Sequence, residues 1–566
     1  MNFKIKISIT IFLVSPLFLA GQDIAKFNIK QPVKINGGLT ATNTFYSAQG
    51  MTARRDPYYW MLSGNVNFNL FGVLSVPISI QVSQQNRSYT QPFNQFGMSP
   101  HYKAWTAHAG YRSVQYSTYS VGGSQWLGGG LEYAPEKHPI YTSVLYGRFQ
   151  KSVTEQVVDG MVTGTPAYER WGYAAKFGYQ KKGRSLHLVL FRGKDNASTV
   201  PDSTAQKAGI KPGENLVWAI NTRQALTKSI NFDLEFAMSA YTLDTRIADG
   251  DLSANSYGGF FHTNTSTQVN KAIQTNVFFN RPLYQLKFSY RRIDPLYKTM
   301  GSIFLNNDIE DISAGLTWRM FKQKLTVSTT GGIQRNNLDD KLTQSLVRNA
   351  FSGSIAYAVS KKVNLNAQYS NFLSNTKFNN LNVTANQLSL QQNADSLLYN
   401  QVTQSASINM SLQFGDTIVR HGVFSTGSWQ QGRDSRENNS DFYSGMAGYT
   451  LNFVKLQLSF NVGVLSTFNT TGGIFNQMLG PSLGINKSIK KVWRIGFTSS
   501  YTTNYSDHKN TGYNLSNRIT AGVKRGKHHS LNADLNWLQR TTTILTQTQN
   551  KKSSELRGSL IYSYTF

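Results

Sequence analysis

Alternation of apolar and polar residues is the dominant pattern along the chain. In "KLQLSFNVGVL", from Lys455 to Leu465, every second residue is Leu, Phe or Val, and Gln, Ser, Asn and Gly stand between them. The last eleven residues, "LRGSLIYSYTF", alternate in the same way up to Phe566. The pattern recurs in "DISAGLTWRM" from Asp311, "VNLNAQYS" from Val363 and "LNADLNW" from Leu531. A period of two over about seven to eleven residues predicts strands with one apolar and one polar face.

The connections between these strands alternate in length. Short ones include "KKGR" from Lys181, "KQ" from Lys322, "GD" from Gly415 and "RGKHH" from Arg525. Long polar ones include residues 196–213, 245–270 and 374–402. A soluble β-sandwich would also show alternating strands, but its Greek-key crossings do not require turns that are short on one side and long on the other. The pattern therefore predicts an all-β fold, a large up-and-down antiparallel transmembrane β-barrel with short periplasmic turns and long extracellular loops.

The predicted strand number is about 26, or about 24 if residues 103–135 form one irregular strand rather than three; both numbers are even, as bacterial barrels require. Charged residues make up only 15% of the chain and aromatic residues 13%, and cysteine is absent, so no disulfide can form. Beyond the first residues, no stretch approaches the roughly 18 apolar residues of a spanning helix. If the chain crosses a membrane, it must do so as a closed barrel.

The amino-terminal residues have the layout of a secretory signal peptide. Lys4 and Lys6 precede a mainly apolar run, residues 9–20, which is too short to cross a bilayer as a helix. We expect cleavage after Gly21. This divides the chain into a signal peptide, residues 1–21, a short segment, residues 22–32, and the barrel, residues 33–566.

Together these features resemble the Gram-negative outer-membrane β-barrel family, over the whole chain after the signal peptide. Within that family, a final strand that ends in an aromatic residue is the targeting signal recognised by the barrel-assembly machinery. "YSYTF", with Tyr562, Tyr564 and Phe566, is similar to that signal. The resemblance implies an integral protein of the outer membrane that contacts its lipid and lipopolysaccharide. It does not extend to the TonB-dependent importers, whose plug domain would precede the barrel, so we expect no separate plug domain.

The net charge of +28 suggests a basic lumen. Eight basic residues fall on the polar parity of predicted strands: Arg148, Lys176, Arg223, Lys287, Arg291, Arg319, Arg494 and Arg557. The acidic residues on the same predicted face are Asp233, Glu235 and Asp534. A lumen lined by Arg and Lys favours anions. Contact with phosphate groups of outer-membrane lipids is the competing explanation. Nucleic acid is not an expected partner of an exported barrel.

Two segments are unusual as loops. Residues 91–105 are predicted to be a loop, yet they are dense in apolar side chains, namely Phe93, Phe96, Met98, Tyr102 and Trp105. Such a cluster should either fold into the barrel mouth or dock a partner. The connection after Arg291 contains Asp308, Glu310 and Asp311, which are weak candidates for binding Ca²⁺. Their spacing does not match an EF-hand, and turn formation is the favoured explanation. We expect no metal and no cofactor.

The sequence does not indicate an enzyme. The pattern "GPSLG" around Ser482 matches a nucleophile elbow, but a basic turn follows it where the elbow needs a helix. Two functions remain. The first is a channel or transporter with a basic lumen, for anionic or polar solutes or polymers. The alternative is a structural subunit of a multi-protein secretion or barrel-assembly machine, whose lumen is closed by loops or partner proteins. A barrel this wide needs such filling, because porins of 16 to 18 strands already enclose an aqueous channel.

Overall fold

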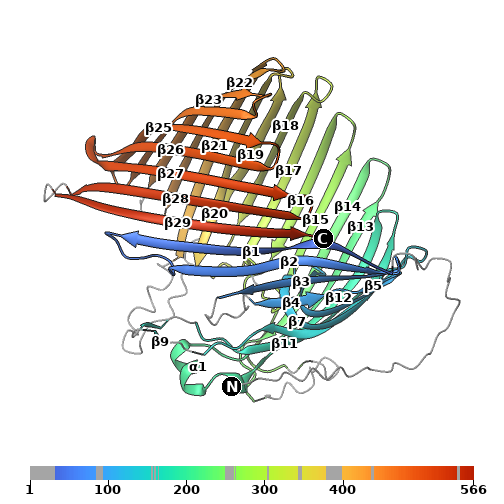
Figure 1. Cartoon of the computed structure of the whole chain (residues 1–566). Helices are drawn as coiled ribbons and strands as arrows, with labels where there is room; N and C mark the ends of the chain where they lie inside the picture. The colour runs from blue at the N-terminus through green and yellow to red at the C-terminus, as the bar shows by residue number, and fades with distance from the viewer. Residues whose placement is uncertain are drawn as a thin grey trace, which may run out of the picture.

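The computed structural model describes residues 32–84, 94–154, 157–158, 161–162, 165–248, 261, 263–302, 305–341, 347–377, 398–434, 439–544 and 549–566. The described residues are mainly β-strands (Figure 1). The first strands are β1 (Val33–Gln49), β2 (Tyr58–Leu70), β3 (Leu74–Ser83), β4 (Gln95–Met98), β5 (His101–Tyr102), β6 (Trp105–Gln115), β7 (Gly122–Tyr133), β8 (Ile140–Gln150), β9 (Val157–Val158) and β10 (Met161–Val162). Next come β11 (Glu169–Lys181), β12 (Arg184–Asn196), a 3₁₀ turn (Ala197–Thr199), helix α1 (Asp202–Ala208), β13 (Glu214–Ala225), β14 (Ile230–Thr242), β15 (Thr267–Asn280), β16 (Tyr284–Ile293), β17 (Ile309–Met320), β18 (Leu325–Arg335) and β19 (Val347–Ala358). The last are β20 (Val363–Lys377), β21 (Leu398–Gly415), β22 (Val419–Asp434), β23 (Ser440–Phe453), β24 (Leu458–Thr471), β25 (Ile474–Ile489), β26 (Trp493–Ser506), β27 (Lys509–Arg525), β28 (His529–Ile544) and β29 (Gln549–Thr565).

The sheet closes on itself. Each strand is antiparallel to the next, and β1 pairs both with β2 and with β29, where Leu39 stands opposite Tyr564. Strands β4 and β5 both lie between β3 and β6 and share one position, while β9 and β10 form a separate hairpin. The described residues therefore form a closed barrel of 26 strand positions. The higher predicted number is confirmed, although residues 103–135 hold two strands, β6 and β7, rather than one or three.

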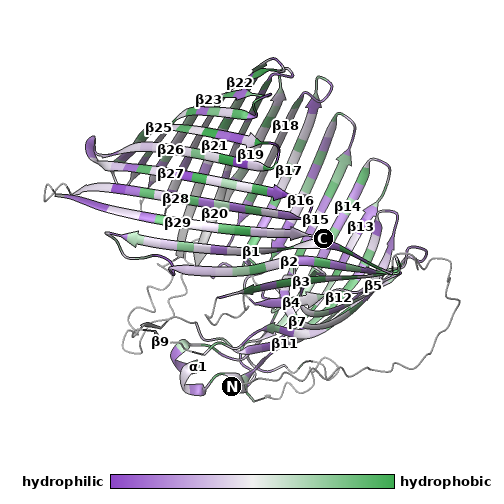
Figure 2. Cartoon of the chain, in the orientation of Figure 1, coloured by the Kyte–Doolittle hydropathy of each residue, from purple (hydrophilic) through white to green (hydrophobic). Residues whose placement is uncertain are grey.

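The two faces of the wall follow from the alternation. On β12, Leu186, Leu188 and Leu190 are exposed, whereas His187 and Val189 between them are buried. On β29, Leu556, Leu560 and Tyr562 are exposed and share one parity, which continues to the exposed Phe566 directly after the strand. Ser563, of the other parity, meets Thr40 of β1 with 3.0 Å between their hydroxyl oxygens. Apolar and polar residues alternate in this way along most strands (Figure 2).

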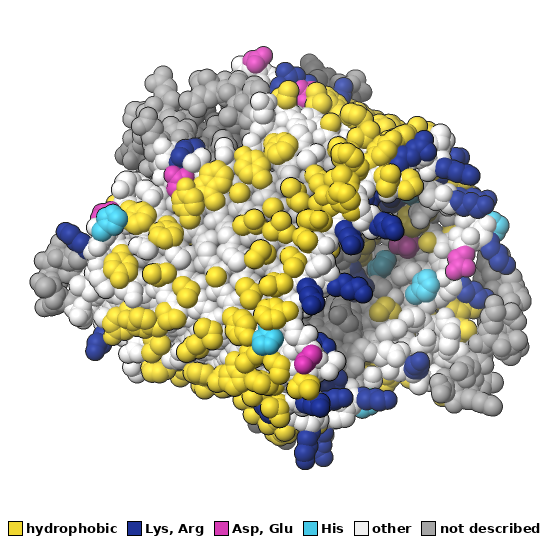
Figure 3. All heavy atoms as spheres, turned by 90° about the horizontal axis from the view of Figure 1, so that it is seen from above, with side chains coloured by type: hydrophobic (Ala, Val, Ile, Leu, Met, Phe, Trp, Pro, Cys, Tyr) yellow, Lys and Arg dark blue, Asp and Glu magenta, His cyan; other side chains and the backbone are white. Residues whose placement is uncertain are grey.

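The exposed apolar side chains cover the outside of the barrel, as the yellow side chains of Figure 3 show. In water such a surface would be costly, but it matches the hydrocarbon layer of a membrane. Closure leaves no strand edge in lipid, where each unpaired backbone group would cost several kcal/mol. The protein is therefore an integral outer-membrane β-barrel. Among the described residues, no helix is long and apolar enough to cross a membrane.

The long connections lie at one end of the barrel, opposite to the row of short turns, as predicted, although at that same end β24–β25 and β26–β27 are joined by only two residues each. Between β11 and β12 the turn consists of Lys182 and Gly183, both with positive φ, at 48° and 77°. Two positive φ angles in succession suit the right-handed twist of a tight hairpin. Between β21 and β22, Oδ1 of Asp416 accepts hydrogen bonds from the amides of Ile418 and Val419. These bonds lower the pKa of Asp416 and stabilise the turn.

Candidate functional site in the barrel lumen

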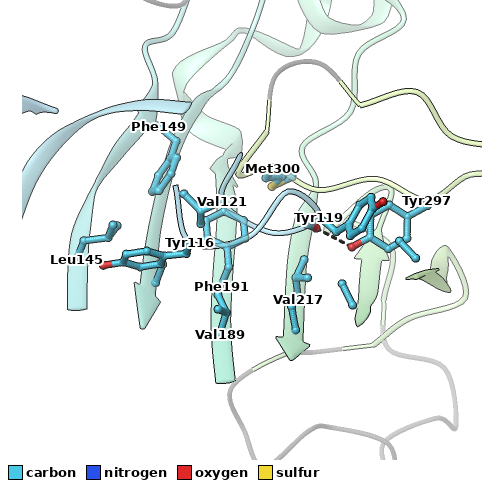
Figure 4. Packing of buried hydrophobic residues seen from close by; sticks show 14 of the residues in the cluster. Tyr116, Tyr119, Val121, Leu145, Phe149, Val189, Phe191, Val217, Tyr297 and Met300 are labelled. Atoms are coloured by element: carbon cyan, nitrogen blue, oxygen red, sulfur yellow. Dashed lines mark hydrogen bonds between the residues drawn. The ribbon is translucent and has the colours of Figure 1, made fainter. Parts of the chain in front are cut away.

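Two connections fold inward and pack against the inner wall. They are the β6–β7 connection around Tyr119 and the β16–β17 connection around Tyr297 (Figure 4). We call the packed set the lumen cluster; it consists of Tyr116, Tyr119, Val121, Trp126, Leu145, Phe149, Ala174, Val189, Phe191, Val217, Ala219, Ala237, Ala272, Ile293, Tyr297 and Met300. Its members on the wall come from β7, β8 and β11–β16. The cluster therefore fills the lumen along one side of the barrel.

Hydrogen bonds tie the two inward connections to each other. The hydroxyl of Tyr297 donates to the backbone oxygen of Tyr119 at 2.6 Å, a bond drawn in Figure 4. The hydroxyl of Thr299 donates to the backbone oxygen of Ser120 at 2.8 Å. Burial raises the pKa of Tyr119 and of Tyr297 further above neutrality, and both phenols are protonated donors near neutral pH.

Polar side chains of the wall hold the β6–β7 connection in place. Glu235 of β14 accepts hydrogen bonds from the hydroxyl of Ser117 at 2.6 Å and from the amide of Tyr119 at 3.1 Å. Gln274 of β15 accepts from the Tyr119 hydroxyl at 3.0 Å. Asn221 of β13 donates to the backbone oxygen of Tyr116 at 2.8 Å. Glu235 thus anchors a loop rather than serving only as a counter-charge to the lumen.

The β16–β17 connection is anchored to the same wall. The amide of Met300 donates to Oδ1 of Asn215 at 3.0 Å, and the hydroxyl of Ser239 donates to the backbone oxygen of Lys298 at 2.6 Å. Both Asn215 and Ser239 are buried polar residues of β13 and β14. Because buried polar groups need partners, these bonds fix where the connection can sit. The lumen cluster therefore combines an apolar core with a specific polar frame.

Most of the basic residues assigned to the lumen lie on the inner face of their strands. For six of them, exposed apolar residues at the alternate positions of the same strand identify the outer face, so the basic residue points inward. These six are Lys176, Lys287, Arg291, Arg319, Arg494 and Arg557. The seventh, Arg223, has the same parity on β13 as Val217 and Ala219 of the lumen cluster. Some are neutralised there: Arg223 is 3.1 Å from Asp233, and Arg291 is 2.9 Å from Asp311. Within the described residues, Arg319, Arg494 and Arg557 have no carboxylate within ion-pair distance.

Arg148 is an exception, because the structure places it on the outer face with Val144 and Tyr146. It donates to the Tyr111 hydroxyl at 3.2 Å and lies 3.5 Å from Glu169. The prediction for this residue is wrong for a physical reason. The inner face of β8 carries Leu145 and Phe149, which pack in the lumen cluster. On this strand apolar residues therefore point into the lumen as well as toward lipid, and they do not identify the outer face.

Among the inner-face arginines that sequence reasoning missed are Arg112, Arg420 and Arg518. Arg112 donates to the hydroxyl of Ser79 at 3.1 Å, and Arg518 pairs with Asp534 at 2.5 Å. Arg420 of β22 lies on the inner side of a strand whose alternation is broken, because its inner face also carries Phe424. The signal that could have found Arg420 is its position directly after a short turn.

The described part of the apolar segment, residues 94–105, is part of the wall, which corrects the prediction of a loop. Phe96 and Met98 lie in β4, Tyr102 in β5 and Trp105 at the start of β6. Phe96 and Trp105 are exposed on the outer face. Strands of four and two residues are too short for alternation to reveal them. Phe93 lies outside the described residues.

The three calcium candidates do not come together. Asp308 accepts hydrogen bonds from the backbone amides of Asn337 and Leu338, at 3.0 and 2.8 Å. Glu310 bonds to Arg335 on the outer face, whereas Asp311 bonds to Arg291 on the inner face. Successive strand residues point to opposite sides, so adjacent carboxylates in β17 cannot share one ion. In the part of the chain that is described, no group of three or more potential metal ligands is present.

The carboxy-terminal residues complete the wall. The amide of Phe566 donates to the backbone oxygen of Gly37 at 3.0 Å, so the last residue is bonded to the first strand. Its ring lies edge-on to that of Tyr564, with 5.0 Å between centroids. Tyr562 is on the same outer face. The pattern around Ser482 lies entirely within β25, without the strand–turn–helix geometry of a nucleophile elbow.

No family model and no curated protein matches the chain. Solved structures that resemble it include the copper transporter OprC, with 7% identity, 94% of this chain and 80% of that chain covered, and a TM-score of 0.39. The FrpB iron transporter from Neisseria meningitidis has 9% identity, coverage of 93% and 81%, and a TM-score of 0.35. OpdK from Pseudomonas aeruginosa, solved with vanillate, has 10% identity, coverage of 94% and 99%, and a TM-score of 0.29. At these values the likeness does not extend beyond the barrel fold.

Proposed function

We propose that the protein is an outer-membrane channel or transporter for anionic or polar solutes or polymers, with a path along the inner faces of β18–β29. The observation that carries this proposal is that the described residues fill the barrel unevenly. The lumen cluster packs against β7, β8 and β11–β16. Across the barrel, the inner face is lined by small polar side chains that bond to one another, as in the pairs Ser370–Ser405, Ser428–Ser444 and Thr450–Asn461.

The width of the barrel supports this proposal. With 26 strand positions spaced about 4.8 Å apart and tilted by about 40°, a round barrel would be about 50 Å across at the backbone. Barrels of eight strands are narrow enough for side chains to fill. A packed cluster on one side of so wide a barrel, opposite a layer of Ser, Thr and Asn, is the arrangement expected of a restricted aqueous path.

The distribution of free charge indicates which solutes would be preferred. Near the long connections, basic residues are mostly paired, as Arg170 is with Asp195 and Arg192 with Glu214. Within the described part of the chain, the short turns are rich in lysines that form no ion pair: Lys181, Lys182, Lys228, Lys322, Lys361, Lys362, Lys455, Lys490, Lys491 and Lys527. Figure 3 shows Lys and Arg side chains gathered around a hollow at one end of the molecule. Such a mouth concentrates anions and repels cations.

Planar-bilayer recording tests the proposal. The purified protein should conduct, and under a KCl gradient its reversal potential should show a preference for chloride. The preference should weaken as ionic strength rises, because exposed charges are screened over about 10 Å at 0.1 M salt. Absence of conductance above the bare bilayer, or a preference for potassium, would overturn the proposal.

A further inference from the structure

We propose that the inner wall of β22–β27, near the short turns, holds a binding site for a linear polyanion between Arg420 and Arg494. The inference deepens the proposed function and rests on it, because it names a ligand class and a place within the same lumen. The ligand carries phosphate, sulfate or carboxylate groups repeated along its length.

The site is a cavity of about 520 Å³ in which both arginines take part. Its floor is one continuous row of paired residues, one from each of six adjacent strands: Arg420, Asn452, Ser459, Asn486, Gly496 and Thr520. Arg494 stands two residues along β26 from Gly496, on the same inner face. Amide and hydroxyl groups therefore lie between two guanidinium groups, which is a surface able to donate hydrogen bonds to an anion.

Gly496 keeps this floor open. A Cβ at that position would lie 2.5 Å from Oδ1 of Asn486 and 2.6 Å from Oγ1 of Thr520. Any larger residue would push both polar groups out of the row. The sequence therefore leaves space at the point where the floor approaches Arg494.

Neither arginine is neutralised within the described part of the chain. Arg223, Arg291 and Arg518 on the inner wall each pair with an Asp, but Arg420 and Arg494 have no carboxylate within ion-pair distance there. The acidic residue nearest to Arg420 along the chain is Asp416, and its Oδ1 already accepts the amides of Ile418 and Val419; the one nearest to Arg494 is Asp507, whose Oδ1 accepts the amide of Phe475. Because no carboxylate of the described residues neutralises these two guanidinium groups, they are available to bind an external anion together with the neutral donors beside them.

The spacing points to an extended ligand rather than a single small ion. Four strand intervals separate Arg420 from Arg494, which puts their backbones about 19 Å apart along the wall. A second cavity, of about 500 Å³, shares Arg420 and Asn452 and adds Lys361 and Lys362, with Asp416 as its one acidic residue. The two cavities form a basic track across β20–β27, and a chain with repeated charges can contact several of its members at once.

Equilibrium binding to the intact barrel in neutral detergent tests the site without requiring conductance. Calorimetric titration with a medium-chain inorganic polyphosphate should show binding to the wild type at low salt, with orthophosphate binding far more weakly. Arg420→Gln and Arg494→Gln should each weaken polyphosphate binding about tenfold, and the double variant about a hundredfold, because each removes a charge-assisted contact. Orthophosphate binding should change much less.

The matched control is Arg148→Gln with Arg335→Gln, which removes the same charge from the outer face. This control should bind polyphosphate as the wild type does. The proposed site would be refuted if the double variant of Arg420 and Arg494 bound polyphosphate as tightly as the wild type. It would also be refuted if the control lost as much polyphosphate affinity as that double variant. If that double variant fails to assemble, the Lys substitutions at both positions provide the second measurement; they should keep the charge and lose only part of the affinity. A barrel without anion-selective conductance that still binds polyphosphate through these arginines would refute the channel and leave the site standing.

Discussion

Removal of the Glu235 carboxylate should release the β6–β7 connection from the wall. Glu235 accepts hydrogen bonds from the hydroxyls of Ser117 and Thr118 and from the amide of Tyr119, at 2.6, 3.2 and 3.1 Å. In Glu235→Ala all three donors lose this charged acceptor, and the Tyr119 amide keeps only its bond to the Ser117 hydroxyl, at 3.2 Å. The apolar contacts of Tyr119 with the lumen cluster remain, so the barrel itself should still assemble.

The size of the effect follows from these bonds. A hydrogen bond to a charged group contributes about 1.5–3 kcal/mol. Thr118 is exposed, so we count only the bonds of Ser117 and Tyr119, and we take the low end because Glu235 is only half-buried. The loss is then about 3 kcal/mol, which raises the ratio of released to packed connection about a hundredfold.

The chain contains no cysteine, so a single introduced thiol reports on this one loop. Ser120 is fully buried and its hydroxyl has no hydrogen-bond partner among the described residues, so Ser120→Cys costs no bond there. A polar maleimide should label Ser120→Cys slowly in the otherwise native barrel. With Glu235→Ala added, the labelling rate should rise about a hundredfold, in proportion to the released population.

Asp233 supplies the control. It lies two residues from Glu235 on the same face of β14, but its carboxylate pairs with Arg223 rather than with the inward connections. Asp233→Ala should leave the labelling of Ser120→Cys slow. If Glu235→Ala labels no faster than Ser120→Cys alone, in barrels that assemble normally, then Glu235 does not hold the loop and the reasoning is refuted.

Three further predictions concern stability and assembly. Deletion of Phe566, which bonds to Gly37, should lower the amount of assembled barrel in membranes more than it alters transport; normal levels by heat-modifiable gel migration would exclude the assembly role. Trp126→Ala empties a fully buried position and should cost about 3–5 kcal/mol, measured by urea unfolding in lipid vesicles; an unchanged midpoint would contradict this packing. Arg246 lowers the pKa of Asp244 through hydrogen bonds, so this pair stabilises its loop above the unfolded pKa of about 4 and the effect is lost as pH falls through the folded value. Protease cleavage of that loop should rise in acid, and Asp244→Asn should remove the pH dependence.

The sequence alone determined the barrel and the orientation of most wall residues. Period-two alternation and turns of alternating length depend on local geometry, since each strand residue points to the opposite side from its neighbour. This is why Phe566 could be assigned to the closing strand, and why the alternation alone placed Arg494 and Arg557 on the inner face. The rule needs a run of several residues, so it failed for Phe96 and Trp105, where the wall is built from short pieces.

Only the tertiary structure decided how the lumen is filled. The bond between Tyr297 and Tyr119 joins residues 178 positions apart, and no local pattern marks such a pair. The same packing makes the inner face of β8 apolar and turns Arg148 outward. The row from Arg420 to Thr520 exists because five strand registers align. Long-range packing and register decide where charges are paired and where they stay free, and the alternation of a single strand carries no information about either.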